Sequence, residues 1–254
     1  MFKICTKKYD HIFFSPHLDD VTLSCGGLIT KLHKAKILVV TIFSGIDEGK
    51  TSNFGKQFIF LSGFNNARDF IESRKSEEKR VARFLGYDFL FLNYPDAIFR
   101  YKKNIFLRQF LYPKDCCCKL SLYDIPLIGK LNEHTRELLK KYLRKNGKIY
   151  FPLGIGRHVD HQITNQLGTQ INNAELYFYE DFPYCINQKW EKSSRYYFIP
   201  KKIYLSKPII FKKYQAINYY KSQIHPVFNT KNNLRVIFFD YYQNCYENYW
   251  YLKK

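Results

Sequence analysis

The sequence of 254 residues lacks any apolar run near the length that a membrane-spanning helix needs, which argues against an integral membrane protein. Its start, residues 1–8, also lacks the continuous apolar segment of a signal peptide, so we expect a cytoplasmic protein. Hydrophobic residues make up 46% of the chain and are spread evenly, with no boundary of composition. The sequence therefore predicts a single domain over residues 1–254.

No Cys-x-x-Cys pair occurs among the seven cysteines, so the chain offers neither a zinc knuckle nor a redox motif. The number of cysteines is odd, and Cys116, Cys117 and Cys118 are consecutive. This usage fits a reducing compartment, where we expect free structural thiols. We assign none of them to a metal.

Acidic residues are scarce: 22 Asp and Glu stand against 41 Lys and Arg, which gives a formal charge of +19. Such a charge raises the question of nucleic acid or an anionic membrane as a partner. The lysines are scattered, however, and no nucleic-acid-binding motif accompanies them, so we expect neither partner. An anionic substrate, such as a phosphorylated or nucleotide-linked sugar, is compatible with this charge.

Short apolar runs alternate with helical patterns along the chain. Strands are predicted at residues 11–14, 37–43, 89–92 and 148–151. Apolar residues at helical spacing predict helices over residues 21–33, 68–85 and 131–143, with Gly86 ending the second and Asn146-Gly147 the third. Strands separated by helices predict an α/β fold with a mostly parallel sheet flanked by helices.

Two short clusters of histidine and aspartate supply the residue types of a catalytic metal site. The first, Ser-Pro-His-Leu-Asp-Asp, spans residues 15–20, and the second, His-Val-Asp-His, spans residues 158–161. His17, Asp20 and His161 form a set of three ligands that leaves one position open for water, as a catalytic zinc requires. Each cluster follows a predicted strand, and open α/β sheets bind ligands outside the carboxyl ends of their strands. We therefore expect the clusters to converge into one metal site at that edge.

The other members of the clusters are candidates for proton transfer, which a metal alone does not complete. Adjacent carboxylates on a strand–helix loop can point differently, so Asp20 can bind the metal while Asp19 acts as the base. His158 and His161 are three residues apart, which on the first turn of a helix places both rings on one face. His158 can then reach the developing oxyanion. An isolated Asp-Asp pair is usually a turn or helix cap, but the two clusters together indicate a functional site.

These clusters resemble those of the LmbE-like or PIG-L-type zinc deacetylases. In that family a His-Pro-Asp-Asp segment after the first strand and a His-x-Asp-His segment after a later strand supply the metal site. The resemblance covers nearly the whole chain and continues in Arg74-x-x-Glu77 with Leu85-Gly86, in Tyr-Pro-Asp-Ala at 94–97, in Pro-Leu-Gly-Ile-Gly at 152–156, in Tyr-Glu-Asp-Phe-Pro-Tyr at 179–184, and in the tail segments 216–223 and 246–250.

The resemblance implies a Rossmann-like fold, with Zn²⁺ held by His17, Asp20 and His161 at the carboxyl ends of the strands. It also implies that Asp19 is the general base and that His158 stabilises the tetrahedral intermediate or protonates the departing amine.

Further positions are expected to support the ligands or to contact the substrate. Asp160 matches a residue that orients a catalytic or ligating ring. Arg74 and Asp96 match positions that contact the sugar in relatives, and we add Asp181 and Arg157 as substrate-binding residues, Arg157 toward an anionic group.

The chain departs from the family pattern at three places. Leu18 replaces the usual proline and Val21 a frequent glutamate, and neither change removes a ligand. Segment 154–157 lacks the tyrosine that some relatives place two residues before the first histidine of the second cluster. Any role of that tyrosine must be absent or filled from elsewhere.

The sequence thus predicts a zinc-dependent hydrolase that removes an acetyl group from an N-acetylated sugar or glycoconjugate. The same ligand set accepts iron, cobalt or manganese. One alternative is an amidase acting on a non-acetyl amide, such as a thiol conjugate. Another is a non-catalytic glycan- or nucleic-acid-binding protein on the same fold, which the +19 charge suggests and the intact ligand-and-base set disfavours. The sequence indicates no particular oligomeric state.

Overall fold

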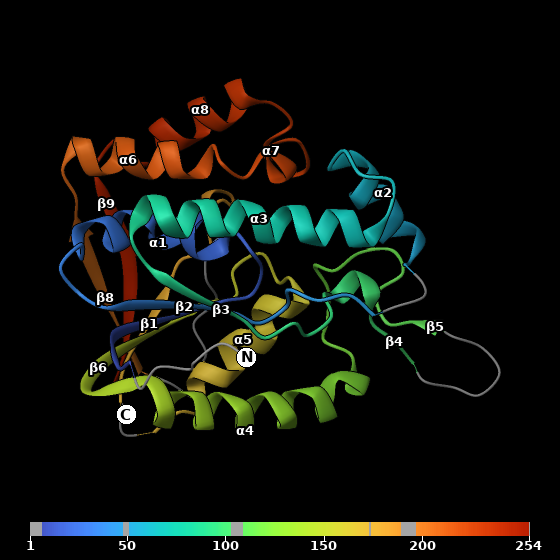
Figure 1. Ribbon diagram of the computed structural model, residues 1–254, viewed down its shortest axis with the longest axis horizontal. Coiled ribbons are helices and arrows are strands. Elements are labelled where there is room, and N and C mark those ends of the chain that lie inside the picture. Colours follow the sequence, from blue (N-terminus) through green and yellow to red (C-terminus); the bar gives the residue numbers. More distant parts are fainter. Residues whose placement is uncertain (1–6, 48–50, 103–108, 173, 189–196, 254) are drawn as a thin grey trace.

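A computed structural model describes residues 7–47, 51–102, 109–172, 174–188 and 197–253 (Figure 1). Among these residues, seven strands form one sheet in the order β3-β2-β1-β6-β7-β9-β8. The strands are β1 (Tyr9–Ser15), β2 (Ile37–Thr41), β3 (Asp88–Phe91), β6 (Leu143–Pro152), β7 (Glu175–Tyr179), β8 (Tyr197–Tyr204) and β9 (Tyr246–Lys253). The first five of these pair in parallel, and β9 runs antiparallel to both β7 and β8. A separate antiparallel pair consists of β4 (Tyr101–Lys102) and β5 (Gln109–Phe110).

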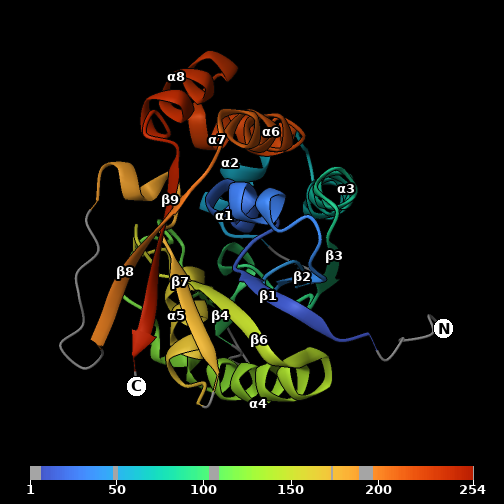
Figure 2. The same cartoon turned by 90° about the vertical axis from the view of Figure 1, so that its left-hand side faces the viewer.

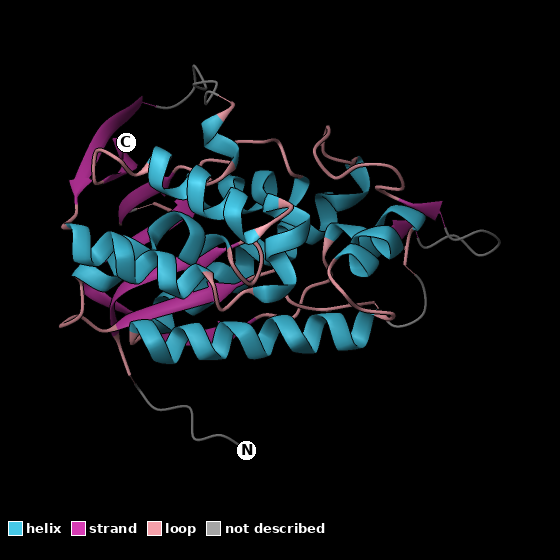
Figure 3. Cartoon of the chain, turned by 90° about the horizontal axis from the view of Figure 1, so that it is seen from above, coloured by secondary structure: helices cyan, strands magenta, loops and turns pink. Residues whose placement is uncertain are grey.

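Helices cover both faces of the sheet (Figures 2 and 3). One face carries α1 (Asp20–Lys31), α3 (Ala67–Leu85) and α6 (Lys207–Ile217), and the other carries α4 (Ile125–Tyr142) and α5 (Val159–Thr169). The remaining helices are α2 (Asn53–Leu61), α7 (Lys221–Phe228) and α8 (Lys231–Tyr241), with short 3-10 turns η1 (Ala97–Phe99), η2 (Leu122–Asp124) and η3 (Tyr184–Ile186). Within the described ranges, every helix is too short or too polar to cross a membrane.

Alternating side chains of β1 build two apolar cores, one on each face. Phe13 stacks on Tyr150, with ring centroids 4.1 Å apart, in the core beneath α1 and α3. Its neighbour Phe14 points the other way and stacks on Phe151, at 4.5 Å, in the core that α4 and α5 cover. A parallel strand buried on both faces needs apolar residues at every position, which explains the continuous runs in the sequence.

The structure confirms the α/β class and the mostly parallel sheet. The strands predicted around residues 11–14, 37–43, 89–92 and 148–151 correspond to β1, β2, β3 and β6. The predicted end of a helix at Asn146-Gly147 is wrong, because α4 stops at Tyr142 and these two residues lie inside β6. The pairing of β6 with β1 is irregular there, and Asn146 has a φ of 105°, as a bulged strand requires.

Lys213 and Glu247, in the C-terminal third of the chain, form a buried ion pair that contacts the middle of α1. Glu247 of β9 accepts hydrogen bonds from the backbone N–H groups of Gly27 and Leu28, at 2.8 and 2.9 Å. The ammonium of Lys213 contacts Glu247 at 2.7 Å and donates to the Ser24 carbonyl at 3.0 Å. Added at Gly27, a Cβ atom would lie 2.7 Å from the Glu247 carboxylate. The glycine therefore permits the close approach that joins α1 to β9.

Removing Lys213 from this pair should strongly destabilise the fold, because the Glu247 carboxylate would stay buried without its cation. We expect Lys213→Met to lower the free energy of unfolding by about 3 kcal/mol, measured by urea denaturation. Lys148→Met is the matched control, since Lys148 pairs with Glu175 at the surface, where the two side chains are 37% and 39% exposed. Its expected cost is below about 1 kcal/mol. Equal losses in the two variants would contradict this account of the pair.

Candidate active site

The first cluster lies in the loop between β1 and α1. The hydroxyl of Ser15 donates to the His17 carbonyl at 2.6 Å and accepts the Val21 N–H at 3.2 Å, so this one side chain closes the loop. The His17 N–H donates to Asp20 Oδ2 at 2.8 Å. These short contacts place Asp20 at the first turn of α1, with His17 beside it.

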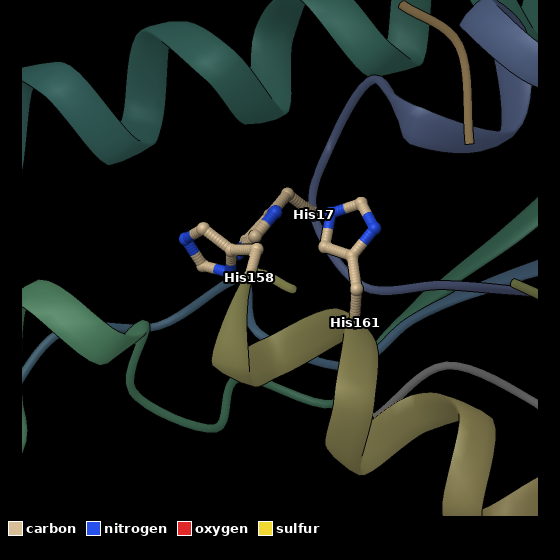
Figure 4. A group of neighbouring side chains, drawn as sticks. All are labelled: His17, His158 and His161. Atoms are coloured by element: carbon tan, nitrogen blue, oxygen red, sulfur yellow. The ribbon is translucent and has the colours of Figure 1, made fainter. Parts of the chain in front are cut away.

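The second cluster begins α5, after β6 and a loop in which Gly154 and Gly156 have φ values of 78° and 88°. His158 caps the helix: its Nδ1 accepts a hydrogen bond from the Asp160 N–H at 3.3 Å. Figure 4 shows the rings of His158 and His161 on this helix facing the ring of His17. The two clusters meet at the carboxyl ends of β1 and β6, as the sequence predicts.

His17 and His161 each place a ring nitrogen beside the same oxygen of Asp20. Asp20 Oδ2 lies 3.2 Å from His17 Nδ1 and 3.3 Å from His161 Nε2. Ligands bound at about 2.0–2.1 Å in tetrahedral geometry are separated by about 3.3 Å, so these distances fit a shared zinc ion. His161 Nε2 is buried and makes no hydrogen bond in the described part of the chain. A buried ring nitrogen that faces a carboxylate oxygen without forming a hydrogen bond fits a metal ligand.

Two further groupings of metal-binding side chains overlap this one: His17 with His158 and His161, and His17 with Asp96 and Asp160. We favour the set that contains Asp20 over the one with Asp96 and Asp160, because Asp160 already binds His17 Nε2 at 3.0 Å and Arg100 at 2.5 Å.

Two buried carboxylates hold the rings of His17 and His161 on the side opposite Asp20. Asp160 accepts from His17 Nε2, which leaves Nδ1 toward Asp20. Asp181 accepts from His161 Nδ1 at 2.6 Å and from the Ile155 N–H at 2.9 Å, which leaves His161 Nε2 toward the same point. A carboxylate behind a ligating histidine fixes the tautomer and raises the basicity of the ring.

The residues predicted to contact substrate have different surroundings. Arg74 and Asp96 line the cavity described below, where Arg74 donates to Asp19 at 2.9 Å and Asp96 lies 3.6 Å from His17 Nε2.

A sugar contact at Asp181 does not fit its position, since that side chain is 2% exposed and both its oxygens are bonded. Arg157, which has a left-handed φ of 58°, is exposed and is absent from the described lining of the cavity.

Negative charge dominates the surroundings of the three histidines. Five carboxylates are buried there against the guanidinium groups of Arg74 and Arg100, namely those of Asp19, Asp20, Asp96, Asp160 and Asp181. Burial alone would lower the pKa of His17, but the nearby carboxylates raise it to about 10. The site therefore favours a positive charge at this ring, which a proton or a metal ion can supply.

Asp19 and His158 differ in the way their surroundings change their pKa values. Burial raises the pKa of Asp19 to about 6, although the guanidinium of Arg74 lowers it. Burial, together with the neighbouring ring of His17, holds the pKa of His158 well below its usual range. The imidazole of His158 is thus neutral at pH 7, and because its Nδ1 accepts a hydrogen bond, its Nε2 carries the proton.

His17, Asp19, Asp20 and His158 line a cavity of about 570 Å³. The sequence reasoning missed Tyr184, whose ring packs edge-on against His161 with centroids 5.6 Å apart. It also missed Gln223, which lines the cavity from α7. Tyr184 ends the segment 179–184 and Gln223 ends the tail segment 216–223, and both segments already carried the family resemblance.

A histidine–carboxylate cluster in a cavity at the carboxyl edge of a parallel sheet defines an α/β enzyme with a candidate metal centre. The chain belongs to the PIG-L family: the family model, described as GlcNAc-PI de-N-acetylase, matches residues 12–172. This confirms the resemblance that the sequence indicated.

Individual relatives extend the likeness beyond that segment. The 2'-N-acetylparomamine deacetylase of Niallia circulans is 27% identical over 199 residues, which cover 68% of this chain and 66% of that protein. The zinc-inhibited form of teicoplanin deacetylase Orf2 shares the fold with a TM-score of 0.84, 21% identity, and coverage of 96% of this chain and 97% of that one. The N,N'-diacetylchitobiose deacetylase from Pyrococcus horikoshii is more distant, with a TM-score of 0.52, 18% identity, and coverage of 96% and 84%.

If Asp181 orients a metal ligand, its loss should weaken metal binding while the ligand atoms themselves remain. We expect Asp181→Asn to lower the affinity for Zn²⁺ by about 10–100-fold, measured by competition with a chromophoric chelator. Asp115→Asn is the control, because Asp115 is an exposed carboxylate that lines the same cavity. Its affinity should stay near that of the parent protein, and an equal loss in both variants would count against the assigned role.

Proposed function

We propose that this protein is a metal-dependent deacetylase that hydrolyses the amide of an N-acetylated sugar or glycoconjugate. The observation that carries the proposal is that ring nitrogens of His17 and His161 lie beside one oxygen of Asp20, next to a cavity that His17, Asp19, Asp20 and His158 line. The deacetylase names of the relatives support this choice of reaction.

Zn²⁺ is the metal we propose, with iron, cobalt or manganese accepted by the same donors. When bound by His17, Asp20 and His161, the ion would supply Lewis-acid activation of the amide carbonyl and of water. The protein would contribute the fixed orientation of the two rings through Asp160 and Asp181.

Asp19 is the general base in this proposal. Its Oδ1 is held by Arg74 and its side chain lines the cavity next to Asp20, so it can take the proton of the attacking water without leaving its ion pair. The proton can then pass to the departing amine.

His158 is the group that meets the developing oxyanion. Its Nδ1 is occupied by the Asp160 N–H, and the remaining Nε2–H is a hydrogen-bond donor with no need of a positive charge. A donor fixed in advance stabilises the oxyanion more than a mobile one.

The polar part of the cavity provides contacts for the sugar. We propose Arg74 and Asp96 for this role, because both line the cavity, whereas Asp181 is bonded to His161 and Arg157 lies outside the described lining. The whole chain, residues 1–254, is proposed to act as one catalytic domain, because the cavity is lined by residues from His17 to Ile237.

Substitution of the base and of a metal ligand should separate turnover from metal binding. We expect Asp19→Asn to reduce kcat by about 10²–10⁴-fold with unchanged metal content, and His161→Ala to lose both metal and turnover. Acetate release and elemental analysis measure the two quantities. Full activity in Asp19→Asn would show that another group takes the proton.

The acyl group can be identified with a panel of amides on the same amino sugar. Release of acetate in preference to a larger acid is the expected result for a deacetylase. Faster release of a larger acid, or turnover of a thiol-linked amide alone, would instead favour the amidase alternative. The Asp115→Asn protein serves again as the control, because it retains the proposed catalytic residues.

A further inference from the structure

We infer that the protein has a second ligand site, a groove between α3 and α6 that takes a nucleoside monophosphate. The groove is separate from the catalytic cavity, and the inference does not depend on the proposed reaction.

The groove has a volume of about 550 Å³ and is lined by residues of α3, of α6 and of the turn that leads into α7. Helices α3 and α6 lie next to each other on one face of the sheet (Figure 2). In the described part of the chain, the lining of the groove shares no residue with that of the catalytic cavity. The residues on which the inference rests are Arg80, Phe84, Phe211, Tyr214, Asn218 and Lys221.

One wall of the groove is a face of α6 that the core does not cover. Phe211, Tyr214 and Asn218 follow one another at i, i+3 and i+7, which is the spacing of a single helix face. The residues of α6 that are buried lie on a different face: Ile210, Lys213, Ala216 and Ile217. Phe211 is 53% exposed, and Tyr219, which also lines the groove, is 36% exposed. Aromatic rings gathered at the surface in this way mark a place where another molecule packs.

The other wall comes from α3. The ring of Phe84 lies 5.4 Å from that of Tyr219, and the ammonium of Lys212 lies 5.5 Å from the centre of the Phe84 ring. Arg80 precedes Phe84 by four residues, so both side chains lie on one face of the helix. The groove therefore brings aromatic rings and positive charges together.

Positive charge around the groove is not balanced by carboxylates from the same segments. Residues 79–84 contain three Lys or Arg residues, residues 207–221 contain four, and neither segment contains Asp or Glu. Lys213 is buried against Glu247, but Arg80 and Lys221 are exposed and line the groove. A concave surface with charges of one sign attracts a ligand of the opposite sign.

The ligand must combine a flat ring with an anionic group, and a nucleoside monophosphate carries both. Its base can stack on the aromatic rings, and its phosphate can pair with Arg80 and Lys221. The amide nitrogen of Asn218 donates to the Tyr214 carbonyl at 2.8 Å, which leaves the amide oxygen to accept from the amino group of a base such as adenine. A volume of about 550 Å³ is in the range of sites for small molecules.

The test is isothermal titration calorimetry of the full-length, metal-loaded protein at low ionic strength, with AMP, adenosine and ribose 5-phosphate as ligands. We expect AMP to bind with a Kd below about 1 mM. Adenosine and ribose 5-phosphate should each bind at least about fivefold more weakly, because one lacks the phosphate and the other the base. A Kd for AMP above about 1 mM, or an equally tight Kd for either fragment, would overturn the inference.

Substitutions in the groove show where AMP binds. Arg80→Glu and Phe211→Ser should each weaken AMP binding by at least about fivefold. Arg136→Glu and Phe60→Ser are the matched controls, since Arg136 is an exposed residue of α4 across the sheet and Phe60 is a 71% exposed residue of α2. Both controls should keep the affinity of the parent protein. Equal losses in Arg80→Glu and Arg136→Glu would show that only net charge matters, and unchanged affinity in both groove variants would place AMP elsewhere, so either result refutes the assignment.

An octaadenylate RNA separates a free nucleotide from the same base and phosphate within a nucleic acid. RNA binding without measurable AMP binding would overturn the inference and assign the groove to single-stranded RNA. The groove variants should keep the parent rate of acetate release, because neither residue lines the catalytic cavity. If no amide is hydrolysed by any of these proteins, the proposed function fails, and the AMP titrations still decide the inference.

Discussion

The arrangement of the site depends on two buried carboxylates that hold the imidazole rings from behind. Asp160 and Asp181 are fully bonded, one to His17, Arg100 and the Ala97 N–H, the other to His161 and the Ile155 N–H. Charges without these partners would be too costly to bury. Because each carboxylate occupies one nitrogen of its histidine, the opposite nitrogens of both rings are left to face Asp20.

Arg100 connects Asp160 to residues that are more distant from the site. Its guanidinium contacts both Asp160 and Asp124, and it lies 5.2 Å from the ring of Phe43 and 5.3 Å from that of Tyr112. The side chain is 5% exposed, and the paired charges keep its pKa above the ordinary value. Segments around residues 43, 100, 112 and 124 thus fix the orientation of one histidine, although none of them belongs to either sequence cluster.

The sequence was sufficient to predict the parallel sheet and the two clusters, because both are encoded locally. Runs such as residues 37–43 can be buried only in a doubly covered strand, and the strand before each cluster determines which edge of the sheet it reaches. Arg100 and Asp181 could not be assigned in this way, since their roles arise from partners 60 and 20 residues away. Glu77 illustrates the same limit: the sequence places it only in a segment that resembles the family, whereas its carboxylate accepts hydrogen bonds from the N–H and hydroxyl of Ser222 on α7.

The place of β9 has a consequence for how the protein is made. This last strand lies between β7, which leads to Asp181, and β8, and its Glu247 is bound inside the helix that begins with Asp20. During synthesis, residues 246–253 leave the ribosome after every ligand and supporting carboxylate has already emerged. The nascent chain must therefore hold one side of β7 unpaired, with α1 lacking its carboxylate partner, until β9 has emerged. Assembly of the site is thereby coupled to the synthesis of β9, and a polypeptide cut short before residue 246 would contain all the proposed metal ligands without the strand that secures them.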